Sequence, residues 1–209
     1  MKLHGYFRSS AAWRVRIALA LKGLSCDQVA VHLRHGDQRA PAYLKINPQG
    51  LVPALETDDG DILTQSLAIC EYLDEIQAEP LLLPGTALER ARIRAFAYAI
   101  ACEIHPLQNL RVLNRLKALG QDEDGVKAWA RETIATGFDA CEALLEGQAG
   151  PYCFGGQITL ADVFLVPQMA NARRFGVELR WPRLHDAEVA CLDHEAFSVT
   201  HPDLQWDAE

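Results

Sequence analysis

The sequence predicts two domains, an α/β domain of residues 1–78 and an all-α domain of residues 87–209, joined by a linker at residues 79–86. Two observations predict this division. Short β-like runs alternate with helical ones in the first part, whereas the sequence after the linker has helical periodicity throughout. Between the two parts, Pro80 and Pro84 interrupt any regular element.

The composition is that of a globular chain and limits the possible partners. The 209 residues are 49% hydrophobic and 23% charged, which suits a folded protein with a buried core. The formal net charge of −8 argues against nucleic acid or an anionic membrane as a partner, because both usually require a basic surface. No stretch is long and apolar enough to span a bilayer, and no apolar leader opens the sequence, so we expect no membrane partner and a cytoplasmic location.

The cysteines and histidines predict neither a disulfide nor a metal site. The six cysteines lie in apolar surroundings without any C-x-x-C pair, which favours buried free thiols and a reducing compartment. Among the seven histidines, only His32 and His35 form a close pair, and this pair is interpreted as surface. We therefore expect no metal ion in this protein.

The first domain is predicted to contain a mixed sheet with helices. The first two strands require crossover connections, whereas the last two form a hairpin. Gly23 ends the first helix. The expected strands are residues 2–7, 26–32, 51–56 and 62–64, and the expected helices are residues 11–22 and a segment that begins at Gln65 and Ser66.

The second domain is predicted to be a helical bundle. Its first long helix is expected to bend at Pro106, because proline removes a helical hydrogen bond. A capping box, Thr159-Leu160-Ala161-Asp162, predicts the start of a later helix. Residues 201–209 look like a loose tail. The other expected helices cover residues 125–146 and 182–197.

The junction between the first strand and the first helix, at Ser9 and Ser10, is the leading candidate for a binding site. Either serine is a suitable helix cap. A helix N-terminus offers backbone N–H groups and the positive end of a dipole, so together with a hydroxyl it can bind an anion. Plain capping without any ligand is the alternative interpretation, and it is the commoner role of serine at such a position.

Six short motifs are spread over nearly the whole chain. They are Ser9-Ser10-x-x-Trp13-Arg14-Val15-Arg16, Asn47-Pro48, Val52-Pro53, Gln65-Ser66-Leu67-Ala68-Ile69, His105-Pro106-Leu107-Gln108-Asn109-Leu110 and Val166-Pro167-Gln168 through Asn171-Ala172-Arg173-Arg174-Phe175. Together they resemble the zeta class of the cytosolic glutathione transferases. The Val-Pro and Gln-Ser pairs are shared by many transferase classes, whereas the serine–arginine stretch and the His-Pro-Leu-Gln-Asn-Leu segment are specific to this class.

The resemblance implies a fold and an activity. The first domain would be thioredoxin-like, the second all-α, and the protein a homodimer. The activity would be glutathione-dependent cis–trans isomerisation of maleylacetoacetate to fumarylacetoacetate, in the breakdown of aromatic amino acids. The alternatives are isomerisation of maleylpyruvate in gentisate breakdown, conjugation of glutathione to small halo acids, and a non-catalytic binding protein of the same fold.

The resemblance also implies which residues hold glutathione. Ser9 and Ser10 would be catalytic, because they would stabilise the glutathione thiolate, and Ser9 is the first choice. Ala11 stands where the class usually has cysteine, so no protein thiol can assist there. The residues expected to bind glutathione are Ser9, Ser10, Ala11, Gln38, Val52, Pro53, Gln65, Ser66, Gln108 and Asn109, with Val52 and Pro53 joined by a cis peptide bond.

The substrates implied by the resemblance carry two carboxylates, which guanidinium groups bind in bidentate fashion. Arg8 lies next to the serines, Arg111 follows Pro106, and Arg174 follows a later helix. These three arginines are the expected substrate clamp. Arg173 and Arg174 are adjacent, and Arg174 is the preferred one of the two.

Overall fold

The structure is a computed structural model that describes all of residues 1–209, and the chain divides into two compact units. The first unit contains Met1–Leu82 together with Asp193–Glu209, and the second contains Leu83–Leu192. No helix has the length and apolar character needed to cross a membrane. The linker at residues 79–86 stays a prediction.

A four-stranded sheet in the order β2-β1-β3-β4 forms the centre of the first unit. β1 (Lys2–Gly5) pairs in parallel with β2 (Asp27–Ala30) and antiparallel with β3 (Ala54–Glu56), and β4 (Ile62–Thr64) is antiparallel to β3. Parallel neighbours require a crossover, and α1 (Ser10–Leu21) supplies it. The predicted mixed sheet is confirmed, with strands shorter than the apolar pattern suggested.

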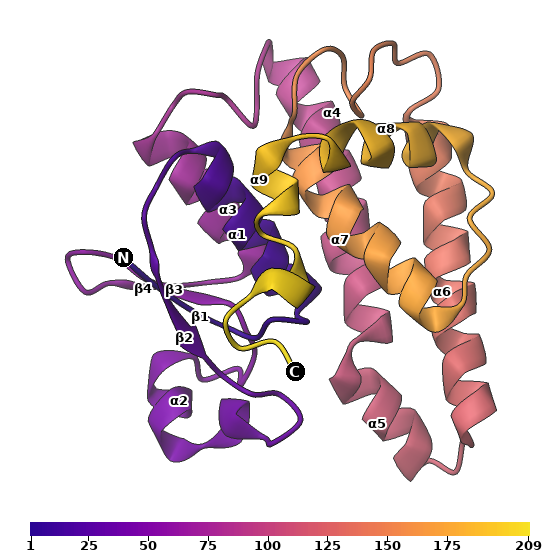
Figure 1. Cartoon of the computed structure of the whole chain (residues 1–209). Coiled ribbons are helices and arrows are strands. Elements are labelled where there is room, and N and C mark those ends of the chain that lie inside the picture. The colour runs from indigo at the N-terminus through magenta and orange to yellow at the C-terminus, as the bar shows by residue number, and fades with distance from the viewer. The chain divides into compact units, whose positions relative to one another are not determined.

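Helices lie on both faces of this sheet. Figure 1 shows α1 and α3 (Ser66–Ile76) side by side on one face and α2 (Pro41–Ile46) on the other. The segment from Ala12 to Leu19 of α1 is buried without interruption. A helix buried on all sides must find partners for any polar side chain that it contains.

A buried ion pair joins the end of α1 to α3. Lys22 Nζ lies 2.5 Å from Asp74 Oδ1, and the two side chains are 0% and 8% exposed. The same carboxylate oxygen accepts a hydrogen bond from Leu82 N–H at 2.7 Å, and Lys22 also donates to the Pro80 carbonyl. The ion pair therefore joins α1 to α3 and also holds the segment after α3, at Pro80 and Leu82, against them.

The second unit is helical, and α7 (Leu160–Phe175) lies at its centre. Nearly all of the first two-thirds of α7 is buried. The predicted capping box is present, because Asp162 Oδ2 accepts from Thr159 N–H and from the Thr159 hydroxyl, each at 2.8 Å. The helices in contact with α7 are α4 (Ala87–Tyr98), α6 (Glu123–Leu144) and α8 (Pro182–Leu192) (Figure 1).

Pro106 lies in a 3-10 turn and not within a long α-helix. After α4 the chain forms a π-helical segment at Ala99–Ile104 and a 3-10 turn at His105–Gln108. A separate helix, α5 (Leu110–Ala118), then begins. Proline lacks the N–H that continues an α-helix and its ring clashes with the preceding turn. The prediction of one long bent helix is therefore wrong.

The C-terminal residues are not a loose tail. The helix predicted at residues 182–197 ends at Leu192, and a short helix, α9 (Glu195–Ser198), and a 3-10 turn at Pro202–Leu204 follow. α9 packs against α1. The prediction of a loose tail at residues 201–209 is wrong, because Asp207 accepts a hydrogen bond from Phe7 N–H and Glu209 binds His32 and Arg34. These partners are distant in the sequence, so no local pattern reveals them.

We predict that Lys22→Met destabilises the protein by about 3–5 kcal/mol, because it leaves the buried Asp74 carboxylate without its cation. Denaturation in urea, followed by circular dichroism, measures this change. Lys117→Met is the control, since Lys117 pairs with Glu123 on the surface. An equal loss in both variants would contradict a special role for the buried pair.

Candidate active site

Three strand ends meet at one edge of the sheet in the first unit. Ala54 pairs with His4 on one side and with Thr64 on the other. Because these neighbours are antiparallel, the end of β1, the start of β3 and the end of β4 lie together. The expected site residues that flank these three strand ends are Ser9, Pro53 and Gln65.

Ser9, and not Ser10, is the cap of α1. Its Oγ accepts a hydrogen bond from Ala12 N–H at 3.2 Å. A hydroxyl that accepts this bond still has its own hydrogen to donate. A Cβ built on Gly5 would lie 3.3 Å from the Ala12 Cβ, so the first turn of α1 packs closely against the end of β1. Ser9 thus offers a donor at the positive end of a buried helix.

Gln65 starts α3 in a strained conformation. Its φ of 70° is the only positive value at a non-glycine residue in the chain. Such backbone costs on the order of 1–3 kcal/mol and persists only where the surroundings enforce it, which is common at binding sites. The side chain donates to Gln49 Oε1 at 2.9 Å. The helix start that follows at Ser66 is suited to a carboxylate.

Gln38 presents a buried acceptor without a partner. It lies in the 3-10 turn Asp37–Arg39, and its Nε2 donates to the Leu33 carbonyl at 3.4 Å. Its Oε1 is buried and has no hydrogen bond in the protein. Because an unpaired buried acceptor is costly, this oxygen suits an N–H donor from a ligand. The predicted cis peptide bond between Val52 and Pro53 is present.

Two buried arginines of α1 support this edge, although neither was among the predicted site residues. Arg14 is 1% exposed and donates to Ser66 Oγ at 3.3 Å. Arg16 is 5% exposed and donates from Nη2 to the Phe7 carbonyl at 3.0 Å. Burial lowers the pKa of Arg16 to about 10, so its guanidinium stays charged at neutral pH. The Arg-x-Arg pattern within a helix of apolar residues was the available signal.

Two of the three expected carboxylate-binding arginines have no ion pair within the chain. Arg8, partly exposed, directly precedes Ser9. Arg111, in the second unit, is exposed in the first turn of α5. An unpaired guanidinium remains available to a carboxylate ligand.

Arg173 and Arg174 differ in their contacts. Arg173 donates from both Nη atoms to the two carboxylate oxygens of Glu188, a residue only 2% exposed. Arg173 is therefore committed to joining α7 and α8. Arg174 lies in the last turn of α7, with its guanidinium 5.2 Å from the centre of the Phe175 ring. Arg174 stays the proposed carboxylate ligand of the two.

Gln108 belongs to a buried amide cluster in the second unit. Its side chain donates to Gln168 Oε1 at 3.4 Å, and the same oxygen accepts from Asn171 Nδ2 at 3.3 Å. Gln108 Oε1 and Gln168 Nε2 are buried without partners. Asn109 is the N-cap residue just before α5, and its side chain makes no capping bond. Gln168 and Asn171 were not among the predicted site residues, although polar residues in a buried helix are a recognisable signal.

Five of the six cysteines have thiols that resist ionisation. Burial raises the pKa of Cys26 to about 11 and the pKa of Cys70 and Cys141 to about 12. Burial also raises the pKa values of Cys153 and Cys191 well above the ordinary thiol range. Cys102 is exposed and Cys26 is partly exposed, so the prediction that all six are buried is wrong. None of these five thiols is an activated nucleophile.

A histidine–carboxylate cluster lies elsewhere in the first unit. His32, His35 and Glu209 place candidate metal-ligand atoms within 4.8 Å of one another. The two rings stack at 3.7 Å with 20° between their planes, so their in-plane lone pairs do not converge on one point. Glu209 already binds both His32 and Arg34. The expectation that the protein holds no metal stays a prediction.

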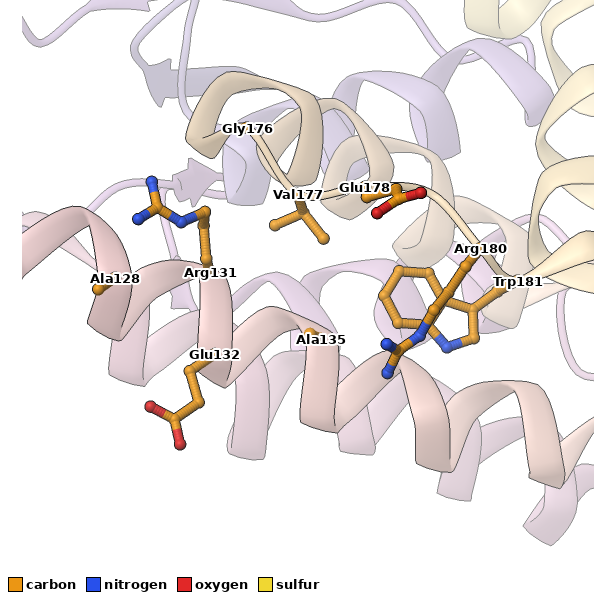
Figure 2. A pocket seen from close by; sticks show the side chains of 9 residues that line it. All are labelled: Ala128, Arg131, Glu132, Ala135, Gly176, Val177, Glu178, Arg180 and Trp181. Atoms are coloured by element: carbon orange, nitrogen blue, oxygen red, sulfur yellow. The ribbon is translucent and has the colours of Figure 1, made fainter.

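A groove of about 420 Å³ in the second unit contains none of the expected site residues. Figure 2 shows its lining, which comes from α6 and from the chain after α7. Its Arg180 binds Asp139 through two contacts of 3.0 Å and stacks on Trp181. That guanidinium is therefore already neutralised, and we place no catalysis in this groove.

Comparisons with known proteins cover both units. Residues 3–81 match the family model of the glutathione S-transferase N-terminal domain, and residues 87–187 match that of the C-terminal domain. The chain is 48% identical to a maleylacetoacetate isomerase of Pseudomonas aeruginosa, over 99% of this chain and 98% of that protein.

Two solved structures are also similar over the full length of both chains. One is a holo maleyl pyruvate isomerase, described as a bacterial zeta-class glutathione S-transferase, with a TM-score of 0.97 and 44% identity. The other is a maleylacetoacetate isomerase of Methylobacterium extorquens AM1 with bound malonate and GSH, with a TM-score of 0.96 and 38% identity.

We predict that Ser9→Ala lowers the free energy of unfolding by about 1 kcal/mol, because it removes the side-chain cap of α1. Ser9→Gly should cost only a few tenths of a kcal/mol, since glycine tolerates the N-cap position. Thermal unfolding of the two variants tests the assignment. Equal stability of Ser9→Ala and the unchanged protein would show that Ser9 is not the cap.

Proposed function

Since the chain belongs to the glutathione transferase family, in its zeta class, we propose that it is a glutathione-dependent cis–trans isomerase that converts maleylacetoacetate to fumarylacetoacetate. The supporting observation is the Ser9 hydroxyl, which caps a buried helix and keeps a hydrogen to donate at its positive end. The name of the relative from Pseudomonas aeruginosa, at 48% identity, supports the choice of substrate.

The start of α1 is able to stabilise a thiolate. A glutathione thiol has an ordinary pKa of roughly 8.5, and lowering it by about two units requires about 2.7 kcal/mol of preference for the anion. A partly buried helix N-terminus contributes up to ~2 kcal/mol. One hydrogen bond to a charged group contributes ~1.5–3 kcal/mol. Ser9 and the helix end therefore suffice, without a metal, a base or a protein thiol.

The rest of the sheet edge suits a peptide cofactor. The γ-glutamyl carboxylate would bind at the start of α3, at Gln65 and Ser66, for the same dipole reason. Val52 and Pro53 would offer their backbone to the cysteinyl part. The unpaired Gln38 Oε1 supports a contact with an N–H group near the glycyl end. Ala11 would contribute backbone only, and Gln108 and Asn109 stay proposed contacts from the second unit.

The proposed mechanism assigns separate tasks to the serine and the arginines. When bound, glutathione supplies a thiolate that adds reversibly to the cis double bond, so that the bond can rotate before the cofactor leaves unchanged. Ser9 holds the sulfur in its ionised form. Arg8, Arg111 and Arg174 bind the two substrate carboxylates and stabilise negative charge that develops on the substrate during the reaction.

Maleylpyruvate is the second candidate substrate. The zeta-class structure described as maleyl pyruvate isomerase matches the whole chain at 44% identity, and the exposed, unpaired Arg111 suits an additional carboxylate. Isomerisation of each substrate, followed spectroscopically with and without glutathione, decides between them. Turnover of neither substrate, together with conjugation of small halo acids, would favour a transferase. A protein that binds no glutathione would be a non-catalytic relative.

We further propose that the protein acts as a homodimer in the cytoplasm, as the zeta-class relationship implies. All six cysteines are free thiols, which suits a reducing compartment.

Ser9→Ala should lower kcat about 10- to 100-fold, since it removes one hydrogen bond to a charged group, worth ~1.5–3 kcal/mol. Glutathione affinity should change far less, because most contacts remain. Steady-state kinetics and calorimetric titration with glutathione give the two values. A larger loss of kcat in Ser10→Ala would transfer the role to Ser10.

Arg174→Ala should raise the KM for the dicarboxylate about tenfold or more, because a charged hydrogen bond contributes ~1.5–3 kcal/mol, and should leave glutathione affinity unchanged. Arg174→Lys should recover part of the loss, since lysine keeps the charge but not the bidentate geometry. An unaltered KM in Arg174→Ala would remove this residue from the clamp.

A further inference from the structure

Thr200 joins the chain after α8 to α1 through two hydrogen bonds. Thr200 is 8% exposed, and its Oγ1 accepts a hydrogen bond from Trp13 Nε1 at 3.0 Å. Its carbonyl accepts from Arg16 Nε at 3.4 Å, and its hydroxyl donates to the Ala196 carbonyl at 2.7 Å. Trp13 and Arg16 are one turn apart on α1, so they hold the same point of the C-terminal segment.

From this anchor the segment reaches back to the loop before Ser9. Phe7 N–H donates to Asp207 Oδ2 at 3.1 Å, and the Phe7 carbonyl accepts from Arg16 Nη2 at 3.0 Å. Phe7 is 4% exposed and lies beyond the end of β1, where no neighbouring strand supplies partners. Both of its backbone groups therefore depend on side chains, one from α1 and one from the C-terminal segment.

We propose that Asp207 is a positioning residue of the thiolate site, which fixes the loop Phe7–Ser9 so that the Ser9 hydroxyl is held toward the sulfur. This inference rests on the proposed function, in which Ser9 stabilises the thiolate. Asp207 acts through the backbone of Phe7 and does not touch the cofactor.

The charge of Asp207 is compatible with an anion nearby. Its carboxylate acts electrostatically on Arg16 and opposes the effect of burial, which lowers the pKa of that guanidinium to about 10. Arg16 thus stays a cation within electrostatic range of the carboxylate and offsets part of its negative charge. The contact that fixes the loop is the hydrogen bond from Phe7 N–H to Asp207.

The end of the C-terminal segment is held by polar contacts more than by a core. Leu204 and Trp206 are 69% and 68% exposed, so they bury little apolar surface. Besides Asp207, the contacts near the end are those of Glu209 with His32 and Arg34. Loss of the Asp207 carboxylate should therefore loosen this segment locally without unfolding the first unit.

Asp207→Ala should lower kcat about tenfold, equivalent to about 1.4 kcal/mol, with KM and glutathione affinity nearly unchanged. Hydrogen–deuterium exchange should show faster exchange of the Phe7 amide in this variant. Asp207→Asn should restore both properties, because its side-chain oxygen accepts the same hydrogen bond. Asp203→Ala is the matched control, since Asp203 lies exposed in the same segment and its side chain contacts only His201.

An unchanged kcat in Asp207→Ala, an equal loss in Asp203→Ala, or failure of Asp207→Asn to restore activity would overturn the inference. So would an unprotected Phe7 amide in the unchanged protein. If Asp207→Ala does not fold, Asp207→Ser replaces it, because the shorter hydroxyl cannot reach Phe7. Absence of turnover in the unchanged protein would contradict the proposed function instead, and the exchange comparison would still decide whether Asp207 holds the loop.

Discussion

The hydrogen bond from Ala12 N–H to the Ser9 hydroxyl is the contact on which the proposed chemistry depends. The Ser9 oxygen accepts a hydrogen bond from the backbone, so the orientation of the hydroxyl is restricted while its hydrogen remains free to be donated to a ligand. The close packing of Gly5 against Ala12 places this helix start directly at the end of β1. One local feature thereby supplies the hydroxyl, the dipole and the backbone donors at the same point.

Holding that point in place requires polar groups in the interior. Arg14 and Arg16 are buried in α1, and each supports a different part of the sheet edge, Ser66 and Phe7 respectively. Burying a guanidinium group costs free energy of folding unless its N–H groups are hydrogen-bonded and its charge is compensated. The positive φ of Gln65 is a second cost at the same edge. Such concentrated strain and burial are typical of a site that is organised before its ligand arrives.

Local patterns in the sequence predicted the elements that depend on local chemistry. The strand–helix junction at Ser9, the capping box at Thr159 and the mixed sheet are all present. The resemblance to the zeta class supplied the cis bond at Val52–Pro53, which no composition or spacing could have indicated. The prediction of one long bent helix failed because the apolar residues keep a helical spacing through Pro106. The backbone there forms π-helical and 3-10 turns and not a continuous α-helix.

Features that depend on distant partners were not predictable from local patterns. The hydrogen bonds of Trp13 with Thr200 and of Phe7 with Asp207 join residues far apart in the chain, and the ion pair of Arg173 with Glu188 joins two different helices. Nothing in the sequence around Thr200, Asp207 or Glu188 indicates these partners. The identity of the cap was open between Ser9 and Ser10 for a related reason, since only the backbone angles decide which residue stands just outside the helix.

The most direct test is a pH titration of the ultraviolet absorbance of thiolate for glutathione bound to the intact protein. If α1 and Ser9 stabilise the anion as proposed, the bound thiol should ionise at least about one unit below its ordinary pKa of roughly 8.5. A bound thiol that titrates at the value of glutathione in solution would contradict the assignment of this helix start as the catalytic centre.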